Sequence, residues 1–426
     1  MGHEFHIARI TLEACSPVMI AAGGDDPLHD VLLARDANGL PMLPATSLAG
    51  VLRHGFGPDE ARELFGYQEG DDGNASRLVF TDALYHWSDD RPRDGIVYER
   101  TALESDKLAK LALRVGPVTR DHVRLNEYGV VDGHGKFERS AAPAGSRFTF
   151  EISERGDGSA LKKVLEHLRK GLWLGGATRS GYGEMAAIRI GCETVDLKKK
   201  ADRYRTLVMQ NLGNRDIKMD PVKAGDGGTA WSFSGRIEGP LMIGAAPQKD
   251  DVDRSCYSED RIRWYDLDTP CIERKTVIPA SAIKGALRHR VLFHLHRLKH
   301  ENPEAALERM FGCPADGAAG QAGSLRFSDI VLDEVTPFKM THVGLDRFTG
   351  GSRRGVLFCD QSIWRPQLEF RITPLRDFGC DTCHNAFMAA LLDLGTGRLG
   401  IGADWGDGAG VFESLSLPDE LQGAIA

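Results

Sequence analysis

Residues 40–52, LPMLPATSLAGVL, recur in this chain as residues 277–287, VIPASAIKGAL, and this repetition decides how the sequence is organised. Each copy has the pattern of an extended apolar segment, a Pro turn and an amphipathic helix that begins near a hydroxyl residue. Such a turn directs backbone N–H groups toward one point, which suits a phosphate or another backbone. A single copy would be read as an ordinary helix cap. Further matches in the same order around both copies indicate a duplication.

The composition limits the classes of protein that need to be considered. A length of 426 residues allows two domains that each bury a core. The net charge of −8 excludes a generally basic nucleic-acid binder, so any nucleic-acid site must be a local basic patch. No apolar run is long enough to cross a membrane, and the N-terminus begins with strand-like alternation rather than a signal peptide, which predicts the cytoplasm. The eight Cys are scattered, as expected of reduced thiols.

Four other motifs accompany the two turns. They are residues 17–20 and 240–243 (PVMI and PLMI), 64–66 and 310–312 (LFG and MFG), 78–82 and 325–329 (LVFTD and LRFSD), and the glycine-rich loops 174–183 and 399–410. Each half therefore reads as strand, helix, strand, insertion, strand, helix, glycine loop and strand. This order predicts the α+β class, with two tandem ferredoxin-like (RRM-like) domains.

The changes in composition predict the domain boundaries. We expect a first domain over residues 1–195 with an insertion at about 92–143, a linker with its own charged helix over 196–229, and a second domain over 230–426 with an insertion at about 337–366. Both insertions are irregular and rich in basic residues. Long segments of this kind are usually functional or disordered, and here they are expected to form hairpins that project from the cores.

With these motifs in this order, each half resembles the RAMP superfamily of CRISPR effector proteins, in particular the backbone subunit of type III complexes. The resemblance covers most of the chain, as two tandem copies. It implies a fused double backbone subunit that lies along a guide RNA and binds a complementary target RNA. It also implies neighbouring backbone, small and large signalling subunits as partners.

The resemblance also implies a catalytic residue in each half. In the family, an Asp in the loop before the Pro turn supports cleavage of target RNA with Mg²⁺ or Mn²⁺. Asp30 and Asp268 match it, so both are predicted to be catalytic and to bind the metal. One carboxylate can hold a metal or orient the attacking 2′-hydroxyl. Asp is also common in turns, and four neighbours compete for the role: Asp25, Asp26, Asp250 and Asp251.

Basic, hydroxyl and aromatic residues of the repeated motifs and of the insertions are the candidates for RNA contact, because such side chains hold phosphates and bases. They are Ser47, Arg53, Arg120, His122, Lys136, Arg179, Tyr182, Ser281, Lys284, Arg288, His342, Arg347, Arg353 and Arg354. Surface ion pairs are the alternative interpretation of the Arg residues. The halves differ at two places: Ala49 stands where the second half has Lys284, and the second glycine loop has Asp404 and Asp407 where the first has Arg179.

One motif does not fit this interpretation. Cys380-Asp-Thr-Cys383-His384 has the form of a c-type haem attachment site or of half a zinc site. Haem attachment needs export, and the sequence has no second Cys-x-x-Cys, with Cys313 and Cys359 the nearest thiols. We therefore interpret the pair as a chance pairing in a loop before the last helix.

Three functions remain open. The first is a guide-RNA-bound ribonuclease subunit, and the second is the same subunit as a catalytically silent scaffold. The third is a guide-processing endoribonuclease of the same superfamily, with His29, His54 or His342 as general base. Whether Asp30 and Asp268 face the target phosphate separates the first two. The tandem repeats and the two hairpins argue against the third.

Overall fold

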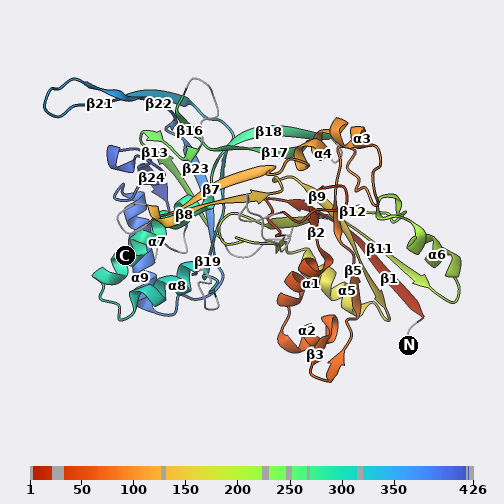
Figure 1. The fold of residues 1–426 in the computed structure, drawn as a ribbon. Helices are drawn as coiled ribbons and strands as arrows, with labels where there is room; N and C mark the ends of the chain where they lie inside the picture. The colour runs from red at the N-terminus through yellow and green to blue at the C-terminus, as the bar shows by residue number, and fades with distance from the viewer. Residues whose placement is uncertain are drawn as a thin grey trace.

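The structure is a computed structural model that describes residues 3–21, 33–125, 131–222, 230–245, 252–265, 269–313, 320–418 and 421. Two domains lie side by side, with most of the first on the right of Figure 1 and most of the second on the left. Each domain buries its own large apolar cluster. In the described part of the chain, no helix combines the length and apolar character that a membrane crossing requires.

The first domain is built on an antiparallel sheet whose central strand, β1 (Glu4–Ala14), is also the first in the chain. β1 pairs with β9 (Arg147–Arg155) on one side and β11 (Glu184–Asp196) on the other, so that Ile10 faces both Phe150 and Ile190 in the core. The short strands β5 (Leu78–Phe80) and β6 (Ala83–Tyr85) pair with the outer side of β9. The spatial order is thus fourth, first, third, second, which is the ferredoxin-like order.

The second domain repeats this order with β24 (Phe412–Ser416), β13 (Trp231–Ile237), β23 (Gln367–Pro374) and β19 (Leu325–Phe327), again antiparallel. Phe233 on β13 lies opposite Phe370 on β23, and their rings stack at 4.8 Å. The predicted α+β class with two tandem ferredoxin-like domains is confirmed.

Two helices cover each sheet. They are α1 (Ala45–His54) and α5 (Ser159–Leu168) in the first domain, and α7 (Ala280–Arg297) and α9 (Asp381–Gly395) in the second. In α7 the buried residues include Ile283, Leu287, Val291 and Leu295, whose spacing of four residues places them on one face. The remaining short elements are α2 (Pro58–Phe65), α8 (Pro303–Phe311), β2 (Met42–Leu43), β3 (Tyr67–Glu69), β4 (Asp72–Asn74), β10 (Leu172–Trp173), β14 (Pro240–Leu241), β15 (Gly244–Ala245), β16 (Arg254–Cys256), β20 (Ile330–Leu332), η1 (Leu212–Asn214) and η2 (Trp405–Asp407).

The repeated motifs bind one another, which explains why they recur together. The Asp that ends each LxF(S/T)D motif accepts the first N–H of the repeated helix: Asp82 from Ala45 at 2.7 Å, and Asp329 from Ala280 at 2.8 Å. A carboxylate therefore already occupies part of each helix N-terminus, which the sequence had suggested as a phosphate site. The basic residue of each turn donates to the glycine that follows the Phe of the next motif, from Arg53 to the carbonyl of Gly66 and from Arg288 to that of Gly312.

Each glycine loop is used in a similar way. Its backbone N–H groups donate to carbonyls of the Pro-x-Met segment of the same domain, each at 2.8 Å: Gly176 to Met19, Gly183 to Pro17, Ala403 to Met242, and Gly410 to Pro240. These N–H groups are therefore satisfied within the protein. The close approach requires glycine, because a Cβ on Gly402 (φ +84°) would lie 2.3 Å from the Met242 carbonyl oxygen.

We expect Gly402→Ala to destabilise the second domain by about 2–4 kcal/mol, because it combines backbone strain at positive φ with a steric clash. Gly406→Ala is the matched control in the same loop, where an added Cβ meets nothing within 4 Å. Thermal unfolding of both variants measures the difference. Equal melting temperatures would show that the loop does not need this contact.

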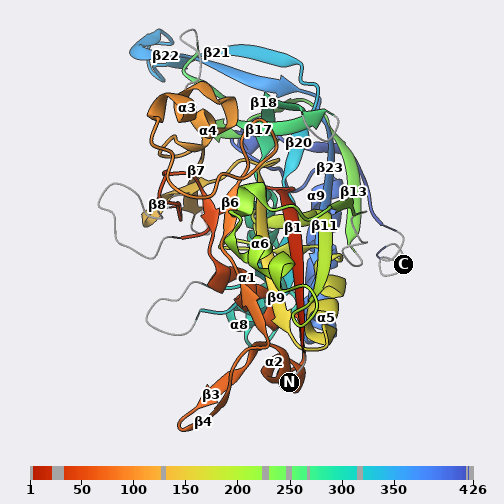
Figure 2. The same ribbon diagram turned by 90° about the vertical axis from the view of Figure 1, so that its right-hand side faces the viewer.

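A hairpin projects from each domain within the predicted insertions. The first is β7 (Val118–Leu125) with β8 (Val131–Ala141), preceded by α3 (Arg100–Ser105) and α4 (Lys107–Ala112). The second is β21 (Pro337–Leu345) with β22 (Ser352–Trp364), which extends far from the body in Figures 1 and 2. Both hairpins carry a cross-strand His–Phe stack, His122 on Phe137 at 5.1 Å and His342 on Phe358 at 4.7 Å.

The predicted linker is folded against the first domain over much of its length. Its helix α6 (Ala201–Met209) contacts β1 and β11 through the Phe5–Tyr204 ring contact at 5.0 Å and the Arg203–Glu193 ion pair at 2.7 Å. The short strand β12 (Asp220–Pro221) then pairs with β11. The sequence pattern of a charged helix did not reveal this packing, because only a few apolar residues carry it.

The two domains are joined by a hairpin of the second domain and a loop of the first. β17 (Ser258–Tyr265) and β18 (Thr269–Ile278) form a hairpin of the second domain that reaches the first (Figure 1), where Ile262 N–H donates to the Ala144 carbonyl at 2.8 Å. In the other direction, the first glycine loop forms a parallel bridge from Ser180 to Phe327. A Cβ on Gly181 would lie 2.0 Å from the Asp329 carboxylate, so this loop packs directly on the start of α7.

Candidate nucleic-acid interface

Four basic residues meet where the first glycine loop packs on α7, and we call them the basic cluster: Arg139, Arg179, Lys284 and Arg288. They come from β8, the glycine loop and α7, so both domains contribute. Burial, and then the positive charges of Arg288, Arg179 and Arg139, lower the pKa of Lys284 to about 8. Burial is the larger cause, and the contribution of three Arg residues indicates that they lie near the Lys284 ammonium.

Three members of the basic cluster have uncharged partners among the described residues. Arg179 donates to the Gly323 carbonyl at 2.6 Å, Lys284 to the Ser180 hydroxyl at 3.3 Å, and Arg139 lies over the Phe137 ring at 4.9 Å. Within the described ranges, no carboxylate forms an ion pair with Arg139, Arg179 or Lys284. In a chain with a net charge of −8, such a cluster is the local basic patch that a phosphate backbone requires.

Two of the predicted RNA contacts in the helices are half-buried. Ser281 lies in the first turn of α7, close in sequence to Lys284, whereas Ser47 lies in α1 in the other domain. Arg53 is also half-buried and donates to the Gly66 carbonyl. The structure thus gathers Arg179, Lys284 and Arg288 at one place and leaves Ser47 and Arg53 with the equivalent turn of the first domain.

Three other predicted RNA contacts are buried, and one of them, Arg120, lies in the contact between the domains. Arg120 is 1% exposed, with nitrogen-to-oxygen distances of 2.7 and 2.9 Å to Glu259 and 2.8 Å to Asp329. Tyr182 is also 1% exposed, and its hydroxyl lies 3.1 Å from Nε2 of His122. Burial and the nearby Arg139 and Arg120 lower the pKa of His122 to about 4. Arg120 thus links the two domains, and burial keeps all three side chains away from an RNA at the surface.

The remaining basic candidates lie on the hairpins. Lys136 is exposed on β8, and Arg347, Arg353 and Arg354 are exposed at the end of the β21–β22 hairpin. Phe348 is 95% exposed at the same end, with Leu345 and Leu357 also exposed on the strands. His342 lies nearer the base of this hairpin, where its Nε2 is 3.2 Å from the Asp360 carboxylate. The end of the hairpin therefore combines apolar and cationic side chains.

The predicted catalytic and metal-binding residues Asp30 and Asp268 lie outside the described residues, as do Asp25, Asp26, Asp250 and Asp251. The backbone around them nevertheless fixes which positions of the two halves correspond. The N–H of Ala34 donates to the Ile20 carbonyl, and that of Tyr257 donates to the Ile243 carbonyl. The carbonyls of Ala34 and Tyr257 in turn accept the N–H groups of Met42 and Val277.

These bonds make Ala34 the counterpart of Tyr257. Asp30 precedes Ala34 by four residues, and the residue that precedes Tyr257 by four is Asp253. Counted along the sequence from these two residues, the position that corresponds to Asp30 is Asp253. Eight positions separate Ala34 from Met42, whereas twenty separate Tyr257 from Val277, because the second half carries the longer β17–β18 hairpin there.

Asp253 is an exposed carboxylate at the base of the second hairpin. Its Oδ2 accepts the N–H of Cys359 on β22 at 2.7 Å, and its own N–H donates to the Cys359 carbonyl at 2.8 Å. The next residue, Arg254, forms ion pairs with Asp360 and with Asp404 of the second glycine loop. Asp404 is one of the two acidic residues that the second glycine loop has where the first has Arg179. Its ion pair with Arg254 holds this loop to the base of the hairpin.

Comparison with known proteins agrees with the repeated fold. A family model described as the RAMP superfamily matches residues 11–186 and 236–413. The chain belongs to the RAMP superfamily. A comparison with curated proteins found no match.

Two solved structures are similar to parts of the chain. The first, described as "Type III-B Cmr-beta Cryo-EM structure of the Apo state", is 14% identical with a TM-score of 0.32, and the match covers 42% of this chain and 96% of that chain. The second, described as "Cryo-EM structure of the Type III-B Cmr-beta bound to cognate target RNA", is 15% identical with a TM-score of 0.31, and the match covers 45% of this chain and 61% of that chain.

The structure adds three residues to the candidate site of this RAMP protein. Arg139 joins the basic cluster, Phe348 joins the end of the second hairpin, and Asp253 is the counterpart of Asp30. Arg139 could have been found from the sequence, because residues two apart in a strand point to the same face and Arg139 therefore lies on the same face of β8 as Phe137. An aromatic residue among basic residues was a signal for Phe348. Asp253 had no signal, because the lengths of the loops before the two turns differ.

Proposed function

We propose that this chain is a backbone subunit of a type III CRISPR effector complex, which binds guide RNA and cleaves complementary target RNA with Mg²⁺ or Mn²⁺. The basic cluster is the observation that carries the proposal. It joins the two RAMP domains at one surface and concentrates positive charge in an acidic protein. The partners in this proposal are the guide RNA, the target RNA and the neighbouring backbone, small and large signalling subunits.

The hairpins support the same function. A guide–target duplex presents stacked bases between two phosphate backbones. A side chain such as Phe348 can stack on a base while Arg347, Arg353 and Arg354 contact the phosphates beside it. Two hairpins in tandem would interrupt the duplex at two places. Base pairing supplies the sequence specificity, so the protein needs no contacts that distinguish bases.

Asp30 and Asp253 are our candidates for the cleaving residue of each half. One oxygen of Asp253 accepts the Cys359 N–H, and within the described residues its other oxygen has no partner. An exposed carboxylate oxygen suits a hard divalent cation, with RNA phosphate and water filling the other positions. The metal would stabilise charge on the phosphate that the adjacent 2′-hydroxyl attacks. The role of Asp253 would be to hold that ion beside the hairpin that displaces the base.

The proposal is tested with the effector complex, a guide RNA and an end-labelled complementary target. We expect guide binding that weakens steeply with salt, and target cleavage with Mg²⁺ or Mn²⁺ that EDTA abolishes. The salt slope is the slope of the logarithm of the guide-binding constant against the logarithm of the salt concentration. Arg139→Gln and Lys284→Gln should each lower its magnitude by about one. Lys218→Gln, an exposed Lys beside Asp220, is the matched control and should leave the slope unchanged.

Three other results would each contradict part of the proposal. A bound target that stays intact with either metal would identify a silent scaffold. Metal-independent cleavage of a guide precursor would identify a processing endoribonuclease. The basic cluster would not contact the guide RNA if the salt slope were the same in Arg139→Gln, Lys284→Gln and Lys218→Gln.

We expect guide binding to weaken by about tenfold between pH 7 and pH 9, because of Lys284. Its pKa of about 8 in the free protein means that most of its charge is lost by pH 9. A bound phosphate favours the charged form, so binding takes up a proton in this pH range. Lys284→Arg keeps its charge and should remove most of the decline, as RNA binding assays at both pH values would show. A wild-type affinity that does not change with pH would contradict this role.

A further inference from the structure

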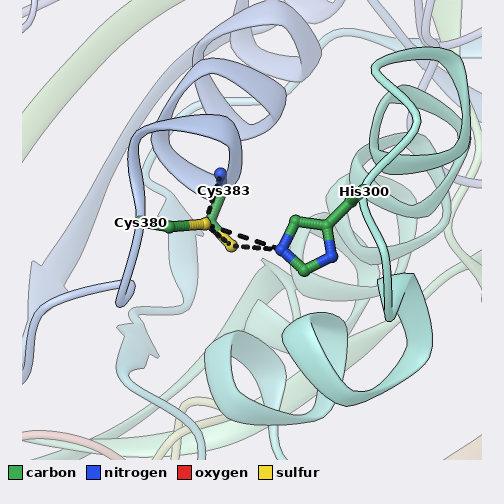
Figure 3. A group of neighbouring side chains, drawn as sticks. All are labelled: His300, Cys380 and Cys383. Carbon is green, nitrogen blue, oxygen red and sulfur yellow. Dashed lines mark hydrogen bonds between the residues drawn. The ribbon is translucent and has the colours of Figure 1, made fainter.

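Three potential metal ligands meet in the helical layer of the second domain, and Figure 3 shows them converging. His300 lies just after α7, Cys380 caps the start of α9, and Cys383 lies in the first turn of α9. Nε2 of His300 is 3.6 Å from Sγ of Cys380 and 3.8 Å from Sγ of Cys383. The third ligand comes from a part of the chain 80 residues from Cys380.

We propose that His300, Cys380 and Cys383 bind a zinc ion that joins the end of α7 to the start of α9. Two thiolates and one imidazole form a typical zinc ligand set, with bonds of about 2.3 Å to sulfur and about 2.0 Å to nitrogen. Tetrahedral bonds of these lengths place nitrogen and sulfur ligands roughly 3.6 Å apart. The two nitrogen-to-sulfur distances agree with that value.

The distance between the sulfurs shows what must change when the ion binds. The sulfurs are 2.9 Å apart, which is longer than the roughly 2.0 Å of a disulfide bond. On one zinc ion they would separate to roughly 3.8 Å. Nδ1 of His300 lies 3.1 Å from the N–H of Asn302, in an exposed contact. A zinc ion on Nε2 requires the proton on Nδ1, so this one contact is released on binding.

The surroundings favour a metal over free thiols. Cys383 is fully buried, with its Sγ 2.9 Å from that of Cys380 and 3.8 Å from Nε2 of His300. A zinc ion lets both thiols lose their protons and compensates the charge that results. Sγ of Cys380 also accepts the N–H of Cys383 at 3.3 Å, which orients it at the helix start. Three protein ligands leave a fourth position for water or another donor.

The proposed site is specific to the second domain. The first-domain helix that corresponds to α9 is α5, and it begins with Gly158 and Ser159, without a cysteine. The zinc would therefore cross-link α7 and α9 in the second domain, whereas the similar pair of helices in the first domain would have no such cross-link. It lies in the helices rather than on the hairpins, so its role would be to stabilise the domain, independently of RNA cleavage.

Metal analysis of the purified full-length chain tests this proposal. We expect about one zinc per chain in the wild type, and a loss of about tenfold or more in zinc content in Cys380→Ser and in His300→Ala. Cys271→Ser and His296→Ala are matched controls on β18 and α7 and should keep the zinc. EDTA should lower the melting temperature of the wild type but not that of Cys380→Ser.

Spectroscopy keeps the proposal testable if a variant fails to fold. Co²⁺ added to the reduced wild type should give thiolate-to-metal absorption that Zn²⁺ removes by competition. A chain without zinc that gives no Co²⁺ signal would overturn the proposal. A Cys380–Cys383 disulfide found by mass spectrometry in chain purified without reductant, together with no bound zinc, would overturn it in favour of a redox pair.

Discussion

When Asp253 is replaced by Asn, the rate of target RNA cleavage is expected to fall by about 100-fold or more at one of two positions. Replacing Asp30 by Asn should have the same effect at the other position. The change removes the negative charge that would hold the metal. It keeps an oxygen that can accept the Cys359 N–H, so the base of the hairpin should remain in place. Rates for each band of an end-labelled target, measured in single-turnover time courses, would show the two effects separately.

Asp268→Asn is the control that distinguishes the two candidates of the second half. Because Asp253 is the counterpart of Asp30 in the hydrogen-bond register, Asp268→Asn should leave both bands unchanged. The opposite pattern, with a band lost in Asp268→Asn and none in Asp253→Asn, would show that the register does not identify the cleaving residue. If both cleavage products still form in a variant with Asp30, Asp253 and Asp268 all replaced by Asn, none of these three residues carries out the cleavage.

The second large effect is expected at the contact between the domains, where Arg120→Met should destabilise the chain by about 3–5 kcal/mol. The substitution leaves Asp329 buried without the cation that contacts it. It also removes one of the two Arg partners of Glu259, which is 3% exposed and keeps its ion pair with Arg261. It also weakens the cap of α7, because the Asp329 carboxylate holds both Arg120 and the Ala280 N–H. Urea denaturation followed by tryptophan fluorescence would measure the loss.

The pH dependence provides a check on the mechanism. Burial raises the pKa of Asp329 above its ordinary value, while Arg120 acts against that rise. Without Arg120 the pKa should rise further, so the destabilisation should be largest at high pH and should decrease as the pH falls and Asp329 takes up a proton. Arg62→Met, which breaks an exposed ion pair with Glu69, should have little effect at any pH. A loss in Arg120→Met that does not vary with pH would argue against an unpaired carboxylate as its cause.

The ferredoxin-like repeat was predictable from sequence because its signals are local. Apolar residues at helical spacing, as in α7, and alternation along β1 depend only on neighbours in the chain. The motifs recur as sets because each contacts another of the same half, as Asp82 contacts the start of α1. Two copies of one set of contacts give a repeat that the sequence displays directly.

The site was predictable only in part, because a basic residue does not show from sequence whether it faces solvent or another domain. Arg120 and Arg179 lie in similar basic, glycine-rich surroundings in the sequence. One is fully buried between two carboxylates, and the other joins the basic cluster. The difference arises from packing between domains. The contact between His300 and Cys380 also depends on packing, because nothing in the sequence near either residue indicates that the other lies beside it.

The buried Arg120 contact also constrains how the chain matures as it is synthesised. Arg120 precedes Glu259 by 139 residues and Asp329 by 209. At about 5–20 residues per second, roughly 10–40 s pass between the synthesis of Arg120 and that of its second carboxylate. Through that interval the first domain can fold on its own sheet, while the face that carries Arg120 stays hydrated and open. The finished contact between the halves is thus a late step, because it awaits translation of Asp329 just after β19 rather than folding of the first domain.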